Sequence, residues 1–119
     1  MIAPSPGPEV LTGSTRLKAG TATKLVLNML TVAAMVRLGK VYENLMVDLR
    51  PKSEKLRARA RRIVRTLTGV DERDSETALR KAGGSVKLAV VMIRRDCSRR
   101  AAESLLRRSE GVLRRALSR

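Results

Sequence analysis

The feature that most constrains the fold of this chain is a long apolar run, Leu25–Leu38. Hydrophobic side chains occupy nearly every face of the helix that this run would form, at Leu25, Val26, Leu27, Met29, Leu30, Val32, Ala33, Met35 and Val36. A helix that is apolar on all sides is normally buried on all sides. In a chain of 119 residues, the other apolar helices are too few to enclose it. We therefore expect another protein surface to cover this helix, and we expect the chain to self-associate as a homo-oligomer.

The helix that contains this run is expected to extend from Thr15 to Leu38 and to end at Gly39, because glycine is common just after helix C-termini. Gly20 lies inside it and would mark a kink or a close approach. Polar residues interrupt the run three times, and the run is shorter than the ~20 residues that span a bilayer. The Pro-rich N-terminus lacks the apolar segment of a signal peptide. These features indicate a cytoplasmic protein without a membrane partner.

A loop rich in glycine, hydroxyls and cations, GPEVLTGSTRLKAGTATK, occupies residues 7–24. Ser14 or Thr15 can cap the first amides of the following helix. Together with Arg16 and Lys18, these amides and hydroxyls form a candidate site for a phosphate or a carboxylate. The alternative is an ordinary capped helix start with surface cations.

The rest of the chain has the pattern of short helices joined by Gly and Asp turns, so we predict a mainly α fold. Residues 1–13 are expected to be irregular, and residues 40–52 to form an extended connector that touches a sheet. Helix starts are predicted at Ser53, at Asp71 or Asp74, at Ser85 and at Ser98. The last three of these helices would form a small bundle of the size of a ubiquitin-associated domain. A final turn, residues 112–117, would pack on it or trail off.

Positive charge dominates the composition, with 26 Lys and Arg against 11 Asp and Glu and a net charge of +15. Such a field attracts nucleic acid, anionic membranes or small phosphorylated ligands. Tyr42 is the one aromatic residue, so single-stranded nucleic acid would find no stacking platform. Arg57, Arg61 and Arg65 are expected opposite the apolar stripe of their helix, and arginine doublets recur in the last helices. We interpret these doublets as a solvated stripe, with a specific binding face as the alternative.

Catalytic or metal-binding patterns are absent from the sequence, which has no His and a single Cys. Cys97 is expected to be a half-buried packing residue at a helix start, because no His base could activate it as a nucleophile. Glu43 and Asp48 are weak candidates for an acid–base pair, and a solvated or ion-paired role is favoured for both. We therefore expect no catalytic residue, no metal and no cofactor in this chain.

The loop at residues 7–24 resembles the signature of the N-acetylmuramic acid 6-phosphate etherases and of the related glucokinase regulatory proteins. The resemblance continues through LVLNML, VRLGKVYENLMVDL and the later helical segments, from Gly7 to about Leu117. It implies that residues 1–50 are the end of a sugar-isomerase-type (SIS) α/β domain and that residues 51–119 are a C-terminal helical domain. The long apolar helix would then belong to an incomplete α/β domain.

The resemblance also implies a lyase of amino sugar catabolism. The etherases cleave the lactyl ether of N-acetylmuramic acid 6-phosphate to N-acetylglucosamine 6-phosphate and D-lactate, by elimination and water addition, with glutamates as acid and base. Carried over onto this sequence, Glu9 would face sugar hydroxyls or a loop amide, and Ser14 and Thr15 would present hydroxyls. Arg16 and Lys18 would supply positive charge near the sugar phosphate.

Two departures from the family pattern shape the prediction. The family has a longer upstream part, with the main phosphate loop and the catalytic glutamates, that has no counterpart here. The segment SRRAAESLLRR, residues 98–108, stands where the family commonly has acidic residues. We therefore expect the C-terminal part of an etherase (a separate domain, half of a split gene or a truncated remnant) that is inactive without the upstream half. The alternatives are a basic helical nucleic-acid-binding protein and a sugar-phosphate-sensing regulator.

Overall fold

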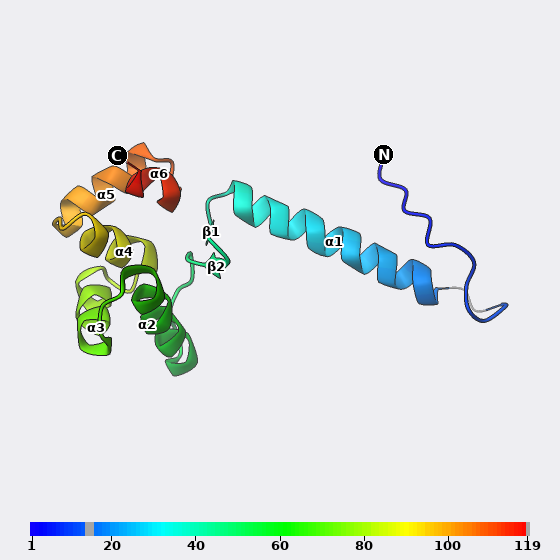
Figure 1. The fold of residues 1–119 in the computed structure, drawn as a ribbon, viewed down its shortest axis with the longest axis horizontal. Helices are drawn as coiled ribbons and strands as arrows, with labels where there is room; N and C mark the ends of the chain where they lie inside the picture. Colours follow the sequence, from blue (N-terminus) through cyan, green and yellow to red (C-terminus); the bar gives the residue numbers. More distant parts are fainter. Residues whose placement is uncertain (14–15, 119) are drawn as a thin grey trace. The chain divides into compact units, whose positions relative to one another are not determined.

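The computed structural model describes residues 1–13 and 16–118. In this part of the chain it contains six helices and one two-stranded sheet, so the prediction of a mainly α fold is confirmed (Figure 1). The chain separates into two compact units, Met1–Met35 and Val36–Arg119. The predicted helix cap at Ser14 or Thr15 lies outside the described residues.

The first unit consists of an irregular lead-in, residues 1–13, and helix α1, Leu17–Arg37. The predicted C-terminus is correct to within one residue, because Gly39 adopts a left-handed φ of 66° and its amide donates to the Val36 carbonyl at 3.0 Å. The close approach predicted at Gly20 is not seen among the described residues. A Cβ added at Gly20 would meet no atom within 4 Å.

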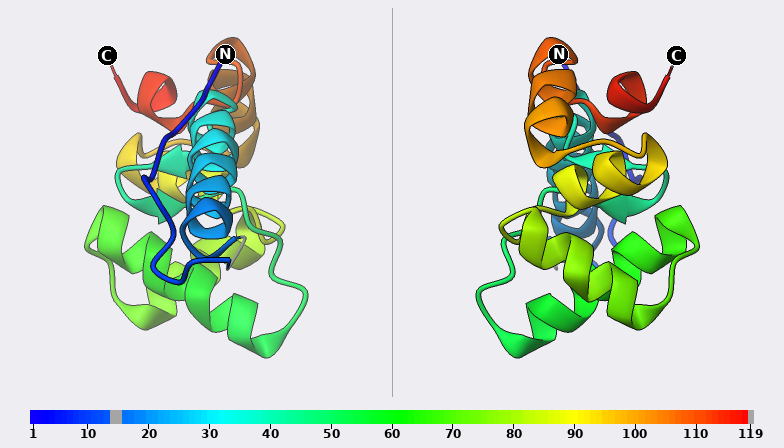
Figure 2. Two further views of the ribbon diagram at one scale, coloured as in Figure 1. Left: turned by 90° about the vertical axis from the view of Figure 1, so that its right-hand side faces the viewer. Right: turned by 90° about the vertical axis from the view of Figure 1, so that its left-hand side faces the viewer.

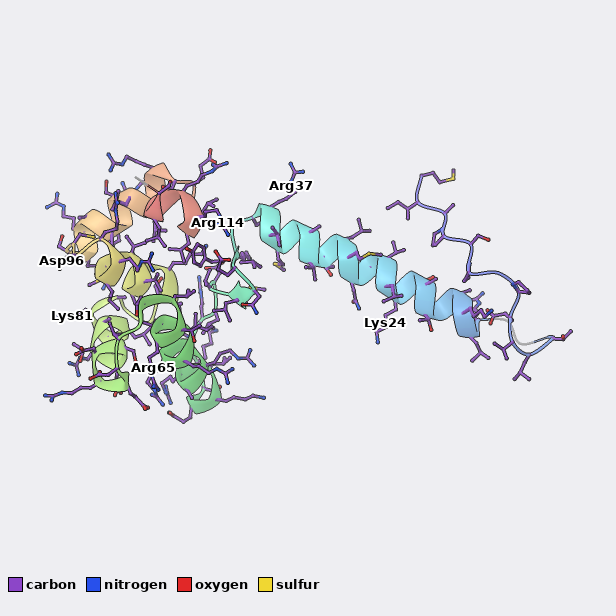
Figure 3. All side chains as sticks on the ribbon, in the orientation of Figure 1. Lys24, Arg37, Arg65, Lys81, Asp96 and Arg114 are labelled. Carbon is purple, nitrogen blue, oxygen red and sulfur yellow. The ribbon has the colours of Figure 1, made fainter. Side chains whose placement is uncertain are left out.

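None of the residues of α1 is buried. Apolar side chains project around the whole helix (Figure 3), and Leu25, Leu27, Met29, Leu30 and Val32 are each 51–63% exposed. With 21 residues, α1 is long and apolar enough to cross a bilayer, a test that the core helix of a soluble protein also passes. The run itself is shorter than a span, as predicted, but the helix that contains it is not, because residues 17–24 are helical as well.

The second unit opens with a short antiparallel hairpin of strands β1, Val41–Tyr42, and β2, Leu45–Met46. Glu43, in the two-residue turn between them, has a φ of 52°, as tight hairpin turns require. The predicted extended connector is thus a hairpin followed by irregular chain. The next residue, Val47, is 1% exposed and belongs to the helical core.

Five helices complete the second unit: α2 Glu54–Thr68, α3 Glu72–Lys81, α4 Val86–Arg94, α5 Arg99–Arg108 and α6 Leu113–Leu117. The predicted N-caps of the first four are confirmed. Ser53, Asp71, Ser85 and Ser98 each accept a hydrogen bond, at 2.8–3.4 Å, from the amide three residues further on. Of the two candidates for the start of α3, the structure therefore selects Asp71.

Helix α4 is the centre of this unit. It contacts α2 and α3 on one side and α5 and α6 on the other (Figure 2). The bundle is larger than the three helices predicted, because α2 and α6 contribute Val64 and Leu113, both 0% exposed, to the same core. The final turn, left open between packing and trailing off, is the packed helix α6.

Candidate functional site

Glu9 closes the signature loop onto the start of α1. Its Oε2 accepts a hydrogen bond from the Lys18 amide at 2.9 Å, and its Oε1 accepts from the Lys18 and Ala19 amides at 3.2 Å. These amides belong to the first turn of α1 and have no carbonyl partner within the helix. A carboxylate nine residues upstream of Lys18 thus does what an N-cap side chain usually does.

Electrostatics favour this position for a carboxylate. The N-terminus of a helix carries roughly half a positive charge, which attracts an anion. Gly7 and Gly13, on either side of Glu9 in the sequence, have left-handed φ values of 77° and 85° that bend the loop at low cost. The amides that the sequence identifies as an anion site therefore bind the chain's own carboxylate. An external phosphate would have to bind beside Glu9 or displace it.

Two of the four remaining site candidates can be placed. Arg16 is exposed and Lys18 is half-buried, and neither side chain forms an ion pair with another described residue. Ser14 and Thr15 lie outside the described residues. A shallow hollow of about 510 Å³ lies at the start of α1, lined by Pro6, Leu17, Lys18, Thr21, Ala22 and Leu25. The hollow thus has an apolar wall and one cationic residue, Lys18, and Glu9 caps the same first turn of α1.

The other candidates from the sequence have structural partners. Glu43 pairs with Arg114 at 2.9 Å, and Asp48 lies 3.8 Å from the Nζ atom of Lys87 and 4.0 Å from that of Lys40. The favoured ion-paired role of both carboxylates is confirmed. Cys97 is half-buried just before the Ser98 cap, as predicted. Among residues 1–13 and 16–118, no three His, Cys, Asp or Glu residues lie close enough together to bind a metal.

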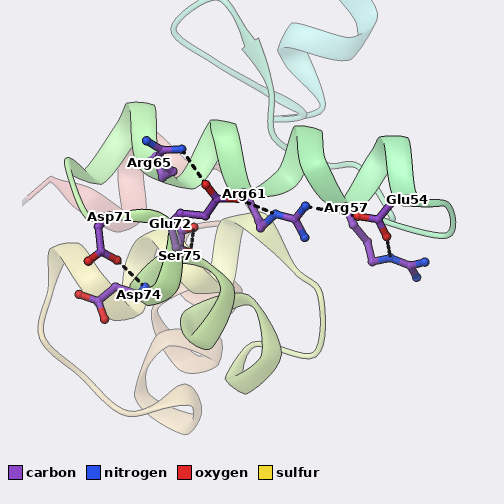
Figure 4. A network of polar contacts seen from close by, with 8 residues as sticks. All are labelled: Glu54, Arg57, Arg61, Arg65, Asp71, Glu72, Asp74 and Ser75. Atoms are coloured by element: carbon purple, nitrogen blue, oxygen red, sulfur yellow. Dashed lines mark hydrogen bonds and ion pairs between the residues drawn. The ribbon is translucent and has the colours of Figure 1, made fainter.

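The arginine row of α2 is part of an ion-pair network that sequence reasoning missed (Figure 4). Glu54 pairs with Arg57 at 3.0 Å and with Arg61 at 3.3 Å, and Glu72 of α3 pairs with Arg61 at 3.8 Å and with Arg65 at 3.6 Å. Hydrogen bonds from Arg57 and then Arg61 lower the pKa of Glu54. The spacing of Glu54 and Arg57, three residues apart on one helix, was the available signal.

Three of the four arginine doublets are also tied into the fold. Arg94 donates to the Leu67 carbonyl, Arg99 binds Glu103 and the Lys81 carbonyl, and both Arg114 and Arg115 pair with glutamates. All of these arginines are exposed, so the predicted solvated stripe is confirmed, although several of its members also bind other residues. Local carboxylates and exposed carbonyls hold at least one member of each of the three doublets.

The chain was compared with known proteins. No family model matches it. It is 55% identical over 109 residues to the N-acetylmuramic acid 6-phosphate etherase of Oceanobacillus iheyensis, covering 92% of this chain and 37% of that protein. It is 56% identical over 112 residues to the Streptomyces coelicolor etherase (94% and 36%) and 51% identical over 117 residues to that of Caldanaerobacter subterraneus (98% and 38%).

The chain spans little more than a third of the length of these relatives, which share about half of its residues over nearly its whole length. The resemblance predicted from the sequence is therefore confirmed: nearly the whole chain is similar to N-acetylmuramic acid 6-phosphate etherases, and it fits the C-terminal portion of these proteins.

Proposed function

We propose that this chain supplies the C-terminal portion of an etherase, a lyase of amino sugar catabolism. The complete enzyme would cleave the lactyl ether of N-acetylmuramic acid 6-phosphate to N-acetylglucosamine 6-phosphate and D-lactate. The observation that carries this proposal is the identity of 51–56% to etherases over 92–98% of the chain. The catalytic glutamates would lie in the part of the enzyme outside the matched region, so we expect the chain alone to be inactive.

The exposure of α1 supports the proposal. In the complete enzyme, residues 1–50 would be the end of a SIS-type α/β domain, and the rest of that domain would cover α1 on all sides. Each Leu, Met or Val side chain that becomes buried would contribute roughly 1.5–3 kcal/mol. Residues 51–119 would form the C-terminal helical domain, and we compare only its three short helices α3, α4 and α5 in size with a ubiquitin-associated domain. Covering α1 would therefore stabilise the assembly through several side chains at once.

The signature loop would border the sugar phosphate. Glu9, held by the amides of Lys18 and Ala19, would fix the path of the loop and present its remaining lone pairs to a sugar hydroxyl. The hydroxyls of Ser14 and Thr15 would bind the substrate, and the cations of Arg16 and Lys18 would attract its phosphate. Charge-assisted bonds of this kind are about twice as strong as neutral ones.

The setting of the enzyme follows from the same proposal. We place it in the cytoplasm, as a homo-oligomer that needs no metal and no cofactor. In this chain by itself, α1 exposes more apolar surface than soluble monomers usually do, so copies of the chain would associate through α1 where the rest of the domain does not cover it.

Association between the two parts tests the proposal. The part of the Streptomyces coelicolor etherase outside the matched 112 residues would be produced separately and mixed with this chain in sedimentation velocity experiments. The parts should form a complex, and the double variant Leu27→Lys and Leu30→Lys in α1 should abolish it. A control variant with lysines at Ala101 and Ser104, both exposed in α5, should bind normally. Absence of a complex with the unmodified chain, or equal binding by the α1 variant, would refute the proposal.

A further inference from the structure

A row of cations on α2 has no role in the etherase proposal. Lys55, Arg59 and Arg62 recur at spacings of four and three residues, so they share one face of the helix. All three are exposed, and none forms a hydrogen bond or an ion pair with another residue in the described part of the chain. We call these three residues the α2 cation row.

The α2 cation row differs from the other arginine row of the same helix. At about 100° per residue, it lies roughly 120° from Arg57, Arg61 and Arg65 around the helix axis. That second row is neutralised by Glu54 and Glu72. The third face carries Ala60, Ile63 and Val64 into the core.

The row has an energetic cost to the helix. Like charges four residues apart destabilise a helix by about 0.2–0.5 kcal/mol per pair. Packing compensates little, because all three residues are exposed and none belongs to the core. These cations destabilise their own helix by repulsion, and no described carboxylate pairs with them. The row is therefore a surface suited to an external anion.

Charge and spacing identify the anion. Residues 36–119 contain 23 Lys and Arg against 10 Asp and Glu. This excess of positive charge means that the whole unit attracts polyanions. From Lys55 to Arg62 the row spans about 10 Å along the helix axis, at about 1.5 Å per residue. Phosphates on one DNA strand rise about 3.4 Å each along the duplex axis, so the long side chains of the row can reach neighbouring phosphates of one backbone.

The described residues fit two other classes of polyanion less well. Ala58 is the remaining residue of a shallow hollow of about 350 Å³ that the row lines, and it offers too little apolar area to insert into a membrane. Tyr42, the single aromatic residue, is half-buried under the Arg114 guanidinium, 5.4 Å from the ring centroid. It cannot serve as a stacking platform for single-stranded bases.

We propose that the α2 cation row binds the phosphodiester backbone of double-stranded nucleic acid, a binding activity independent of ether cleavage. The contacts are to phosphates alone, so binding does not depend on base sequence. Each phosphate contact releases condensed counterions, and three contacts contribute about −2.7 to the slope of log K against log salt concentration.

The test measures that slope for the full chain with a fluorescein-labelled 20-base-pair DNA duplex by fluorescence anisotropy, between about 50 and about 200 mM salt. The triple variant Lys55→Gln, Arg59→Gln and Arg62→Gln should flatten the slope by about 2.7. The matched control, Arg73→Gln, Arg95→Gln and Arg108→Gln, removes the same charge from exposed positions in α3, at the C-cap of α4 and in α5. It should change the slope by less than about 1.

Three results would overturn the proposal. The first is no binding of the duplex by the unmodified chain near about 150 mM salt. The second is an equal change of slope in the two triple variants, since that would reduce the effect to net charge. The third is tighter binding, through the same three side chains, to vesicles of phosphatidylserine and phosphatidylcholine in equal amounts. Circular dichroism spectra should show the same helix content in both variants as in the unmodified chain, because Gln has nearly the same helix propensity as Lys and Arg.

Discussion

Replacing Glu9 removes the contact that closes the signature loop onto α1. In Glu9→Ala, the amides of Lys18 and Ala19 lose the acceptors that lie 2.9–3.2 Å away. In Glu9→Gln, a carbonyl oxygen of similar reach remains while the negative charge is lost. The pair of variants therefore separates hydrogen bonding from the attraction between a carboxylate and the helix N-terminus.

The size of each effect follows from the geometry. Loss of a helix cap costs about 0.5–2 kcal/mol, and loss of a charge that complements the helix dipole costs about 0.3–1 kcal/mol. Glu9→Ala loses both, and a free energy of about 1–2 kcal/mol corresponds to about a 5- to 30-fold change in the equilibrium for local opening. Glu9→Gln loses chiefly the charge, which corresponds to about a 2- to 5-fold change.

Amide hydrogen exchange by NMR reads this opening directly at Lys18 and Ala19. Both amides should exchange faster in the two variants, with the larger change in Glu9→Ala. The control is Glu103→Ala, which removes a carboxylate paired with Arg99 at 2.8 Å on α5 and should leave both amides unchanged. Unaltered exchange in Glu9→Ala would refute the account of the loop.

The second unit supports three further predictions. Leu113→Ala should destabilise it by about 2–5 kcal/mol in urea denaturation, because this fully buried side chain leaves a cavity; a loss below 1 kcal/mol would contradict the described core. Gly39→Ala should lower the melting temperature, since the new Cβ would lie 2.9 Å from the Val112 Cγ2 atom at a φ of +66°. In the control Gly20→Ala the new Cβ meets open space, so this variant should instead stabilise α1 by about 0.5–1 kcal/mol. A Gly20→Ala variant less stable than Gly39→Ala would overturn this reasoning. Arg57 and Arg61 lower the pKa of Glu54, so the stabilisation from its carboxylate is present above the ordinary value of 4.5 and is lost as pH falls through the lowered value. Melting curves should show Glu54→Gln less stable than the unmodified chain near neutral pH and the difference vanishing in acid; a constant difference would contradict the ion pairs.

Helix boundaries could be predicted because their causes are local. Ser53, Ser85 and Ser98 each accept a bond from an amide only three residues away, so the sequence alone carries the signal. Gly39 and Gly69 likewise end helices through their own left-handed conformations. The cap of α1 could not be found in this way, because its acceptor, Glu9, comes from nine residues upstream of the amide.

Packing between helices was harder to predict for the same reason. Four helices share α4, and the choice of which short helices join a bundle depends on contacts between residues far apart in the chain. The pairing of Arg61 and Arg65 with Glu72 depends on the turn that brings α3 back against α2. The α2 cation row could not be distinguished in the sequence from the paired arginines of the same helix, because only the fold shows which cations Glu54 and Glu72 bind.

The most direct test of the central claim is the release of D-lactate from N-acetylmuramic acid 6-phosphate. The chain would be assayed alone, beside the separately produced remainder of the Streptomyces coelicolor etherase, and with the two parts mixed. We predict no release by the chain alone, and release by the mixture that exceeds the sum of the separate parts. Release by the chain alone, or a mixture no more active than its parts despite forming a complex, would contradict it.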